Sequence, residues 1–163
     1  MIEHVRLHVA RALARPVLLH QGAGRPTEAW DARRKQHSST HILRWLGEVG
    51  PRDGKVLGIT DVDLFIPILT FVFGEAQLGG PVAVVSTARL VDPASRLDPR
   101  VVHERLAKEA VHELGHAFGL LHCATPRCVM GRSPSLREVD LKTGHPCPQC
   151  RERIDAPGQR GDA

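Results

Sequence analysis

The sequence has no apolar stretch long enough to cross a membrane. Its longest nearly apolar run is LFIPILTFVF, residues 64–73, which Pro67 interrupts and which falls well short of the ~20 residues of a membrane helix. The first residues, MIEHVRLHVARALARPVLL, carry charges throughout and do not resemble a secretion signal. No internal repeat or low-complexity block is visible. We therefore expect a protein without a membrane anchor, located in the cytoplasm.

Cysteine is absent from the first 122 residues, and the last third of the chain holds Cys123, Cys128, Cys147 and Cys150. In a reducing compartment, such a cluster binds metal more often than it forms disulfides. The two pairs have the spacings C-x4-C and C-x2-C, as in a structural zinc site whose four thiolates close the coordination shell. Metal-free thiols, or His145 as a substitute ligand, are the alternatives.

The composition is that of an ordinary globular domain. The chain has 163 residues, of which 42% are apolar and 25% charged, which suits one domain with its own core. The formal charge of +4 and the pI of about 9.2 give only a modest basic balance. We interpret this balance as a solvated surface and do not expect nucleic acid as a partner.

Hydrophobic patterns predict a mixture of strands and helices. An amphipathic helix is expected over residues 40–49, a polar loop over residues 22–39, and a long helix beginning near Arg100. Loose alternation or apolar, partly β-branched composition predicts strands at residues 1–10, 55–64, 69–78 and 81–90. The last of these is a candidate edge of a cleft, where an extended peptide could add as another strand. Beyond residue 123 the chain is rich in proline, cysteine and glycine, which predicts a small irregular lobe.

The segment HELGHAFGLLHC, residues 112–123, carries the strongest chemical signal. At 100° per residue, His112 and His116 share one side of a helix. The opposite side is continuously apolar and consists of Ala107, Ala110, Val111, Leu114, Ala117, Phe118 and Leu121. A core histidine would lie within that apolar stripe. These two histidines therefore indicate a metal site.

Three further residues complete the pattern. Glu113 stands beside the two histidines without being a ligand, Gly119 tolerates the positive φ of a tight turn, and His122 can return as third ligand. Three neutral nitrogens leave a fourth position on Zn²⁺ for water, whose pKa falls to about 7. Glu113 would then act as general base. Random shuffling of this composition reproduces the whole pattern in roughly 2 of 10,000 sequences, so coincidence is a poor explanation.

His122 and Cys123 are consecutive, so their side chains can serve different ions. We therefore predict two Zn²⁺ ions per chain, a catalytic one held by three histidines and a structural one held by four cysteines. His4 and His8 also have the spacing i and i+4, but they fall in a segment expected to form a strand. We therefore do not expect them to bind one metal ion together.

These motifs resemble those of a known family. HELGHAFGLLH fits the HExxHxxGxxH signature of the metzincin zinc peptidases, and the following CATPRCVM and CPQC fit the extended pattern of the archaemetzincins. Met130 matches the methionine of the turn beneath the catalytic zinc. The resemblance implies an α/β fold in which a twisted mixed sheet packs on a backing helix and an active-site helix. It also implies a zinc-stapled C-terminal lobe.

From this resemblance we expect a single metzincin-like catalytic domain over residues 1–154. The composition of residues 155–163, DAPGQRGDA, predicts a disordered tail. Its upper lobe would span residues 1–122 and its lower lobe residues 123–154. The expected activity is that of a metallopeptidase, an endopeptidase or an aminopeptidase, acting as a monomer on peptides or unfolded proteins. The chain contains no tyrosine, so it departs from metzincins that place one near zinc, and no pro-segment with a blocking cysteine is recognisable.

A binding module is the alternative from another functional class. The cysteine lobe would then resemble a zinc ribbon that contacts nucleic acid or protein, with a catalytically silent histidine site. Its basic residues are Arg127, Arg132, Arg137, Lys142, Arg151 and Arg153. Glu113 argues against this alternative, because a binding module has no use for a carboxylate beside an open zinc. The lobe also lacks aromatic residues on which bases could stack.

Overall fold

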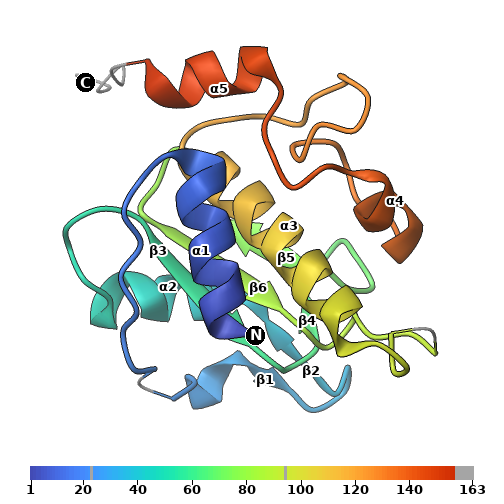
Figure 1. The fold of residues 1–163 in the computed structure, drawn as a ribbon. Helices are drawn as coiled ribbons and strands as arrows, with labels where there is room; N and C mark the ends of the chain where they lie inside the picture. The colour runs from blue at the N-terminus through green and yellow to red at the C-terminus, as the bar shows by residue number, and fades with distance from the viewer. Residues whose placement is uncertain (23, 94, 157–163) are drawn as a thin grey trace.

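The computed structural model of the chain describes residues 1–22, 24–93 and 95–156 (Figure 1). Its helices are α1 (Ile2–Leu13), α2 (Ser39–Val49), α3 (Pro99–Ala117), α4 (Leu136–Leu141) and α5 (Pro148–Asp155), with a 3₁₀ turn at Thr27–Ala29. Its strands are β1 (Trp30–Asp31), β2 (Gln36–Ser38), β3 (Val56–Thr60), β4 (Leu64–Phe65), β5 (Gly74–Ala76) and β6 (Val82–Ser86). Within the described residues, no helix combines the length and the apolar character needed to span a bilayer.

The strands form two small mixed sheets. In the first, β6 lies between β3, to which it is parallel, and β5, to which it is antiparallel. In the second, β2 pairs with β1 antiparallel and with β4 parallel. The polar segment at residues 22–39, predicted as a loop, therefore contains two short strands. Strand β6 is paired on both sides, so the prediction that residues 81–90 form a cleft edge is wrong, and β3 and β5 are the edges of this sheet.

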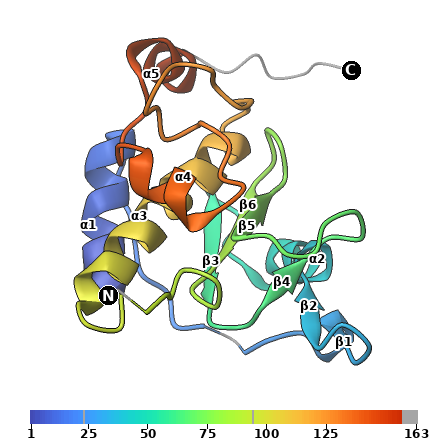
Figure 2. The same ribbon diagram turned by 90° about the vertical axis from the view of Figure 1, so that its right-hand side faces the viewer.

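Helices cover both faces of the sheet that contains β6. Val82 and Val84 pack with Ile42 and Leu43 of α2, whereas Val85 packs into the core formed with α1 and α3. This alternation follows from the period of two of a strand, whose successive side chains point to opposite faces. Figure 2 shows the resulting layers, with α1 and α3 on one side of the sheet and α2 on the other.

Residues 1–10 do not form the predicted strand. They belong to α1, whose buried Val5, Val9, Ala12 and Leu13 recur at helical spacing and pack against α3. The apparent alternation depended on Leu7, which is exposed. The true pattern is thus an amphipathic helix with one buried stripe.

Helix α3 begins where the sequence predicts and ends earlier than its apolar pattern suggests. Asp98 caps its N-terminus by accepting a hydrogen bond from the main-chain N–H of Arg100, and Pro99 occupies the first turn. The helix ends at Ala117, so Leu121 is not part of its apolar face and is exposed.

The C-terminal region is more regular than predicted, since α4 and α5 account for much of it. The predicted tail begins at Asp155, which still belongs to α5, and the rest of that prediction falls largely on residues 157–163, outside the described residues.

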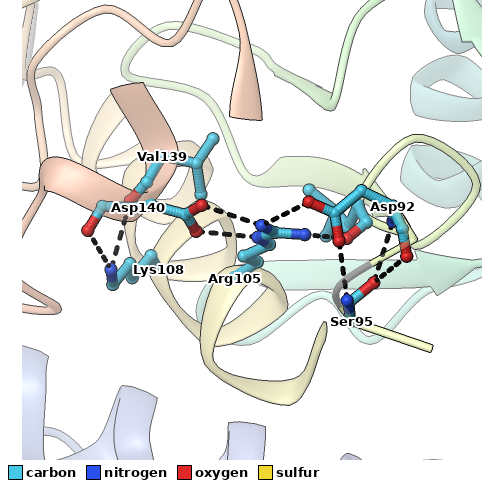
Figure 3. Close-up of polar contacts among 7 residues, drawn as sticks. Asp92, Ser95, Arg105, Lys108, Val139 and Asp140 are labelled. Atoms are coloured by element: carbon cyan, nitrogen blue, oxygen red, sulfur yellow. Dashed lines mark hydrogen bonds and ion pairs between the residues drawn. The ribbon is translucent and has the colours of Figure 1, made fainter. Parts of the chain in front are cut away.

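Arg105 joins α3 to two other segments (Figure 3). Its guanidinium, on a side chain that is almost wholly buried, donates to both carboxylate oxygens of Asp140 at 2.7 and 2.8 Å. It also donates to Asp92 at 3.1 Å and to the carbonyl of Leu90 at 2.9 Å. One turn further, Lys108 donates to two main-chain carbonyls of α4. These bonds attach α4 and the segment after β6 to the long helix.

Replacing Arg105 with methionine should lower the free energy of unfolding by about 2 kcal/mol, because its hydrogen bonds are lost while the partly exposed carboxylates of Asp92 and Asp140 regain water. The guanidinium holds the pKa of the Asp92 carboxyl well below its usual range. The stabilisation from this pair is therefore present above about pH 4 and is lost as the pH falls through the depressed pKa. Urea unfolding of the metal-loaded protein measures the difference.

Arg100→Met is the matched control, because the Arg100 side chain is 86% exposed. It should change the free energy of unfolding by less than about 0.5 kcal/mol. Equal losses in the two variants would contradict the role assigned to Arg105.

Candidate metal centres

Three histidine side chains converge at the C-terminal end of α3. His112 and His116 lie on successive turns, and His122 follows Gly119, whose φ of 89° lets the chain turn back. The ligand nitrogens of the three rings all lie within 4.8 Å of one another. The rings of His112 and His122 are stacked with centroids 5.4 Å apart, and the His116 ring is edge-on to both.

The donor set fits one tetrahedral zinc ion. Nε2 of His112 and Nε2 of His116 are 3.2 Å apart, and two nitrogens bound to the same tetrahedral Zn²⁺ lie about 3.3 Å apart. The other nitrogen of each ring bonds to a main-chain carbonyl, Nδ1 of His112 to Val129 at 2.8 Å and Nδ1 of His116 to Leu120 at 2.7 Å. Such bonds select the tautomer that leaves Nε2 free to bind metal.

The surroundings favour the neutral form of these imidazoles. Burial lowers the pKa of His112, and the ammonium of Lys142 lowers it further. Burial also lowers the pKa of His116 and of His122. Neutral imidazole is the form that binds metal. His112 is buried and His122 is exposed, so the cluster is open to solvent on the side of His122.

Glu113 lies against strand β5. A Cβ atom at Gly74 would come within 2.8 Å of its Oε1 and 2.6 Å of its Cγ, so only glycine leaves room for this side chain. Glu113 is 5% exposed, and burial, followed by the charge of Glu109, raises its pKa well above the usual range. A carboxylate with a raised pKa accepts a proton more readily near neutral pH.

Met130 packs against the same part of α3. Its side chain is fully buried, and a Cβ atom at Gly115 would overlap its sulfur. The main-chain N–H of Cys123 donates to the Met130 carbonyl at 2.9 Å. The glycine in the middle of HELGH is therefore explained by the close approach of Met130, which the motif alone did not reveal.

The four cysteines form a second group, with ligand atoms within 4.8 Å of one another. The Sγ atoms of Cys123 and Cys147 are 3.8 Å apart, and those of Cys128 and Cys150 are 3.9 Å apart. These separations are far too long for disulfides and match the ~3.8 Å between two thiolates on one tetrahedral Zn²⁺.

Main-chain N–H groups favour the thiolate at Cys147. This residue occupies the N-cap position of α5, and hydrogen bonding from the Cys150 N–H is the main reason that its pKa falls to about 6. His145, considered above as a substitute ligand, is not part of the cysteine group, and its ring lies 5.3 Å from that of His8.

A buried ion pair lies behind the histidine cluster. Lys142 Nζ donates to Glu109 Oε1 at 3.1 Å, and both side chains are less than 5% exposed. The hydroxyl of Ser133 donates to the same carboxylate oxygen at 2.9 Å. Lys142 Nζ is also 3.4 Å from Nδ1 of His112. Lys142, named above among the basic residues of the binding-module alternative, is therefore not available at the surface for contact with a partner.

Comparison with known proteins identifies the family. The model for peptidase family M54 matches residues 52–156. An archaemetzincin from Methanopyrus kandleri is 40% identical over 161 residues, which cover 99% of this chain and 90% of that protein. The chain belongs to the archaemetzincins of peptidase family M54. The family resemblance expected from the motifs is thus confirmed.

Solved archaemetzincins have the same fold. The crystal structure of the Methanopyrus kandleri archaemetzincin covers 94% of this chain and 83% of its own, with a TM-score of 0.86 at 40% identity. That of the Archaeoglobus fulgidus archaemetzincin, complexed with malonate, has a TM-score of 0.81 at 36% identity, covering 93% of this chain and 90% of its own. These similarities confirm the predicted metzincin-like α/β class.

Glu109, Lys142, Gly74 and Gly115 were not recognised from the sequence. Glu109 had a usable signal, because it lies three residues before His112 and therefore on the histidine side of α3. Lys142 had none, since its contact joins positions 33 residues apart. The two glycines are explained only by the side chains that approach them.

Lys142→Met should destabilise the metal-loaded protein by about 3–5 kcal/mol, because it leaves the Glu109 carboxylate buried without its partner. The double variant with Glu109→Met should recover part of this loss, since no buried charge remains. Equilibrium unfolding of the two single variants and the double variant measures the coupling between the residues.

Lys35→Met is the control, since Lys35 is exposed, and it should leave the free energy of unfolding within about 0.5 kcal/mol of the parent value. Additive losses from Lys142 and Glu109 would show that the two residues stabilise the protein independently.

Proposed function

We propose that the chain is a zinc metallopeptidase in which Glu113 is the general base and the cysteine-bound zinc is structural. The observation that carries the proposal is the convergence of three imidazoles with lowered pKa values and a buried carboxylate beside them. His112, His116 and His122 would hold the catalytic ion through nitrogens. When bound, zinc supplies a Lewis acid that polarises the scissile carbonyl and lowers the pKa of a nearby water.

Glu113 would handle the proton. Its carboxylate takes a proton from the attacking water, and the resulting carboxylic acid gives that proton to the departing amine nitrogen. Burial favours both steps, because the raised pKa lets the group accept the proton and lets it be held until the C–N bond breaks. The charge of Glu109 raises the pKa of Glu113 further, whereas the charge of Lys142 lowers it.

The open edge of β5 is the proposed binding surface for the peptide. Gln77 N–H and Phe73 C=O bond to β6, and main-chain groups alternate in direction along a strand. The main-chain groups of Gly74 and Ala76 therefore point away from β6. A substrate in extended conformation can pair with them as an added strand. Because Gly74 also contacts Glu113, such a strand would pass directly beside the base.

The cysteine centre would maintain the C-terminal region. Cys128 and Cys150 are buried, and together with Val139 and Ile154 they join the main core. Few other apolar side chains of this region are buried, so coordination of one ion by four thiolates would provide stability that packing alone does not. The single catalytic domain over residues 1–154 and the monomeric state remain predictions.

The binding-module alternative gains nothing from the structure. Lys142 is buried in an ion pair, which removes one of the cations that this hypothesis needed. Residues 123–156 contain no Phe, Trp or Tyr, so the large aromatic side chains on which bases stack are missing there. Family membership also favours the peptidase.

Glu113→Gln should reduce peptide hydrolysis by about 10²–10⁴-fold, the usual contribution of a general base, while zinc content stays at the parent value. A library of peptides with free and blocked N-termini measures the loss and also separates endopeptidase from aminopeptidase action. Glu48→Gln is the control, because Glu48 is exposed on α2 and belongs to none of the ligand groups. Full activity of Glu113→Gln would rule out the proposed base.

Each centre should lose its own ion. His122→Gln, at an exposed position, should lower the zinc content by one equivalent and abolish hydrolysis with little change in thermal stability. Cys150→Ser, at a buried position, should also lose one equivalent but unfold at a clearly lower temperature. Metal analysis and calorimetry of both variants test this. Loss of the same ion in both variants would contradict two separate centres.

A further inference from the structure

A third group of potential ligands lies between α1 and α3. His4 and His8 occupy successive turns of α1, and Glu104 lies on the neighbouring α3. The ligand atoms of these three residues lie within 4.8 Å of one another, as do those of the histidine cluster and of the cysteine cluster. Because residues 1–10 form a helix, the two histidines share one face, whereas a strand would have separated them by some 13 Å.

One separation in this group has the value expected around a metal ion. Nε2 of His4 and Oε1 of Glu104 are 3.1 Å apart. The corresponding Nε2 atoms of His112 and His116 are 3.2 Å apart, and two nitrogen or oxygen ligands of one tetrahedral ion lie about 3.3 Å apart. The spacing therefore agrees both with coordination chemistry and with the catalytic centre of the same chain.

His8 is held in the manner of a metal ligand. Its Nε2 lies 2.9 Å from the carbonyl oxygen of Gly144, and as a donor in that bond it leaves a lone pair on Nδ1. The histidines of the catalytic centre use the same arrangement, with one nitrogen bonded to a main-chain carbonyl. A Cβ atom at Gly144 would overlap the His8 ring. The glycine thus permits the close approach that fixes this imidazole.

A simple ion pair explains the contact between His4 and Glu104 less well. Nε2 of His4 is shielded from solvent, yet it has no partner in hydrogen-bonding geometry within the described part of the chain. The 3.1 Å separation from the Glu104 carboxylate is short enough for a hydrogen bond, so it is the relative orientation of the two groups that does not suit one. A cation that both groups face satisfies the nitrogen and the carboxylate together.

We propose that His4, His8 and Glu104 form a third metal site, for a divalent transition-metal ion. Two imidazoles and one carboxylate suit Zn²⁺, Ni²⁺ or Cu²⁺ and are poor ligands for Ca²⁺ or Mg²⁺. Glu104 is exposed, so solvent can complete the coordination shell. The site binds its ion more weakly than the four-thiolate centre and exchanges it with the medium.

Such an ion would clamp α1 to the active-site helix. Glu104 precedes His112 by eight residues, about 12 Å along α3. His8 also contacts Gly144, in the segment that leads to Cys147. An ion at this site therefore ties together α1, α3 and the approach to the cysteine centre, without touching the residues that perform the chemistry.

Counting the bound metal ions tests the site on the full, zinc-loaded chain. Purified protein is equilibrated with excess Zn²⁺, or with Ni²⁺ as an alternative probe, and the metal per chain is counted. We expect His4→Asn and Glu104→Gln each to bind one equivalent less than the parent protein. We also expect excess Zn²⁺ to raise the unfolding temperature of the parent but not of these variants. His103→Asn is the control, because the ring of His103 lies 6.2 Å from that of His4 outside the triad.

The difference between parent and variants decides the outcome, so the test does not depend on how many ions the other centres hold. Equal metal content in the parent, His4→Asn and Glu104→Gln would overturn the proposal. An equal loss in His103→Asn would also overturn it, since the effect would then belong to the general histidine content of this surface. Peptide hydrolysis measured in parallel keeps a failure of this site distinct from a failure of the proposed peptidase activity.

Discussion

The packing of α3 against β6 determines where the chemistry can lie. Ala107, Ala110 and Ala117 are fully buried, and their small side chains allow the helix to approach the sheet closely. Once that face is committed to the core, His112 and His116 must point to the other side. The helix then ends, and the positive φ of Gly119 returns the chain toward its own last turn. The histidine cluster is thus a geometric result of burying the apolar face of one helix.

Polar contacts attach the C-terminal region to that helix. Arg105 and Lys108 hold α4 from one side (Figure 3). Lys142 enters the space behind His112 and pairs with Glu109. Buried charges of this kind add little stability compared with apolar packing, but they tolerate only one relative position of the groups. For a site that needs accurately placed ligands, fixing that position matters more than the energy gained.

Local sequence patterns predicted the long helix, the metal-binding motifs and the fold class. The features that they did not predict depend mostly on contacts between segments far apart in the sequence. The long helix, the family motifs and the α/β class follow from spacing within a few turns of chain. The N-terminal helix was misjudged because Val5, Leu7 and Val9 alternate as in a strand, and only packing shows that Leu7 is outside the core. The edge position of β5 depends on which strands pair, and the burial of Lys142 depends on a partner 33 residues away. Neither the edge position of β5 nor the burial of Lys142 changes the local pattern of apolar and polar residues.

His122 and Cys123 are adjacent residues that face two different clusters, so a single peptide bond would join the two proposed coordination spheres. Thiolates are oxidised far more readily than imidazoles. An oxidant that attacks only sulfur would release the main chain at Cys123 and, with it, the neighbouring imidazole. Inactivation by oxidative stress would then require no reaction at any group that touches the peptide.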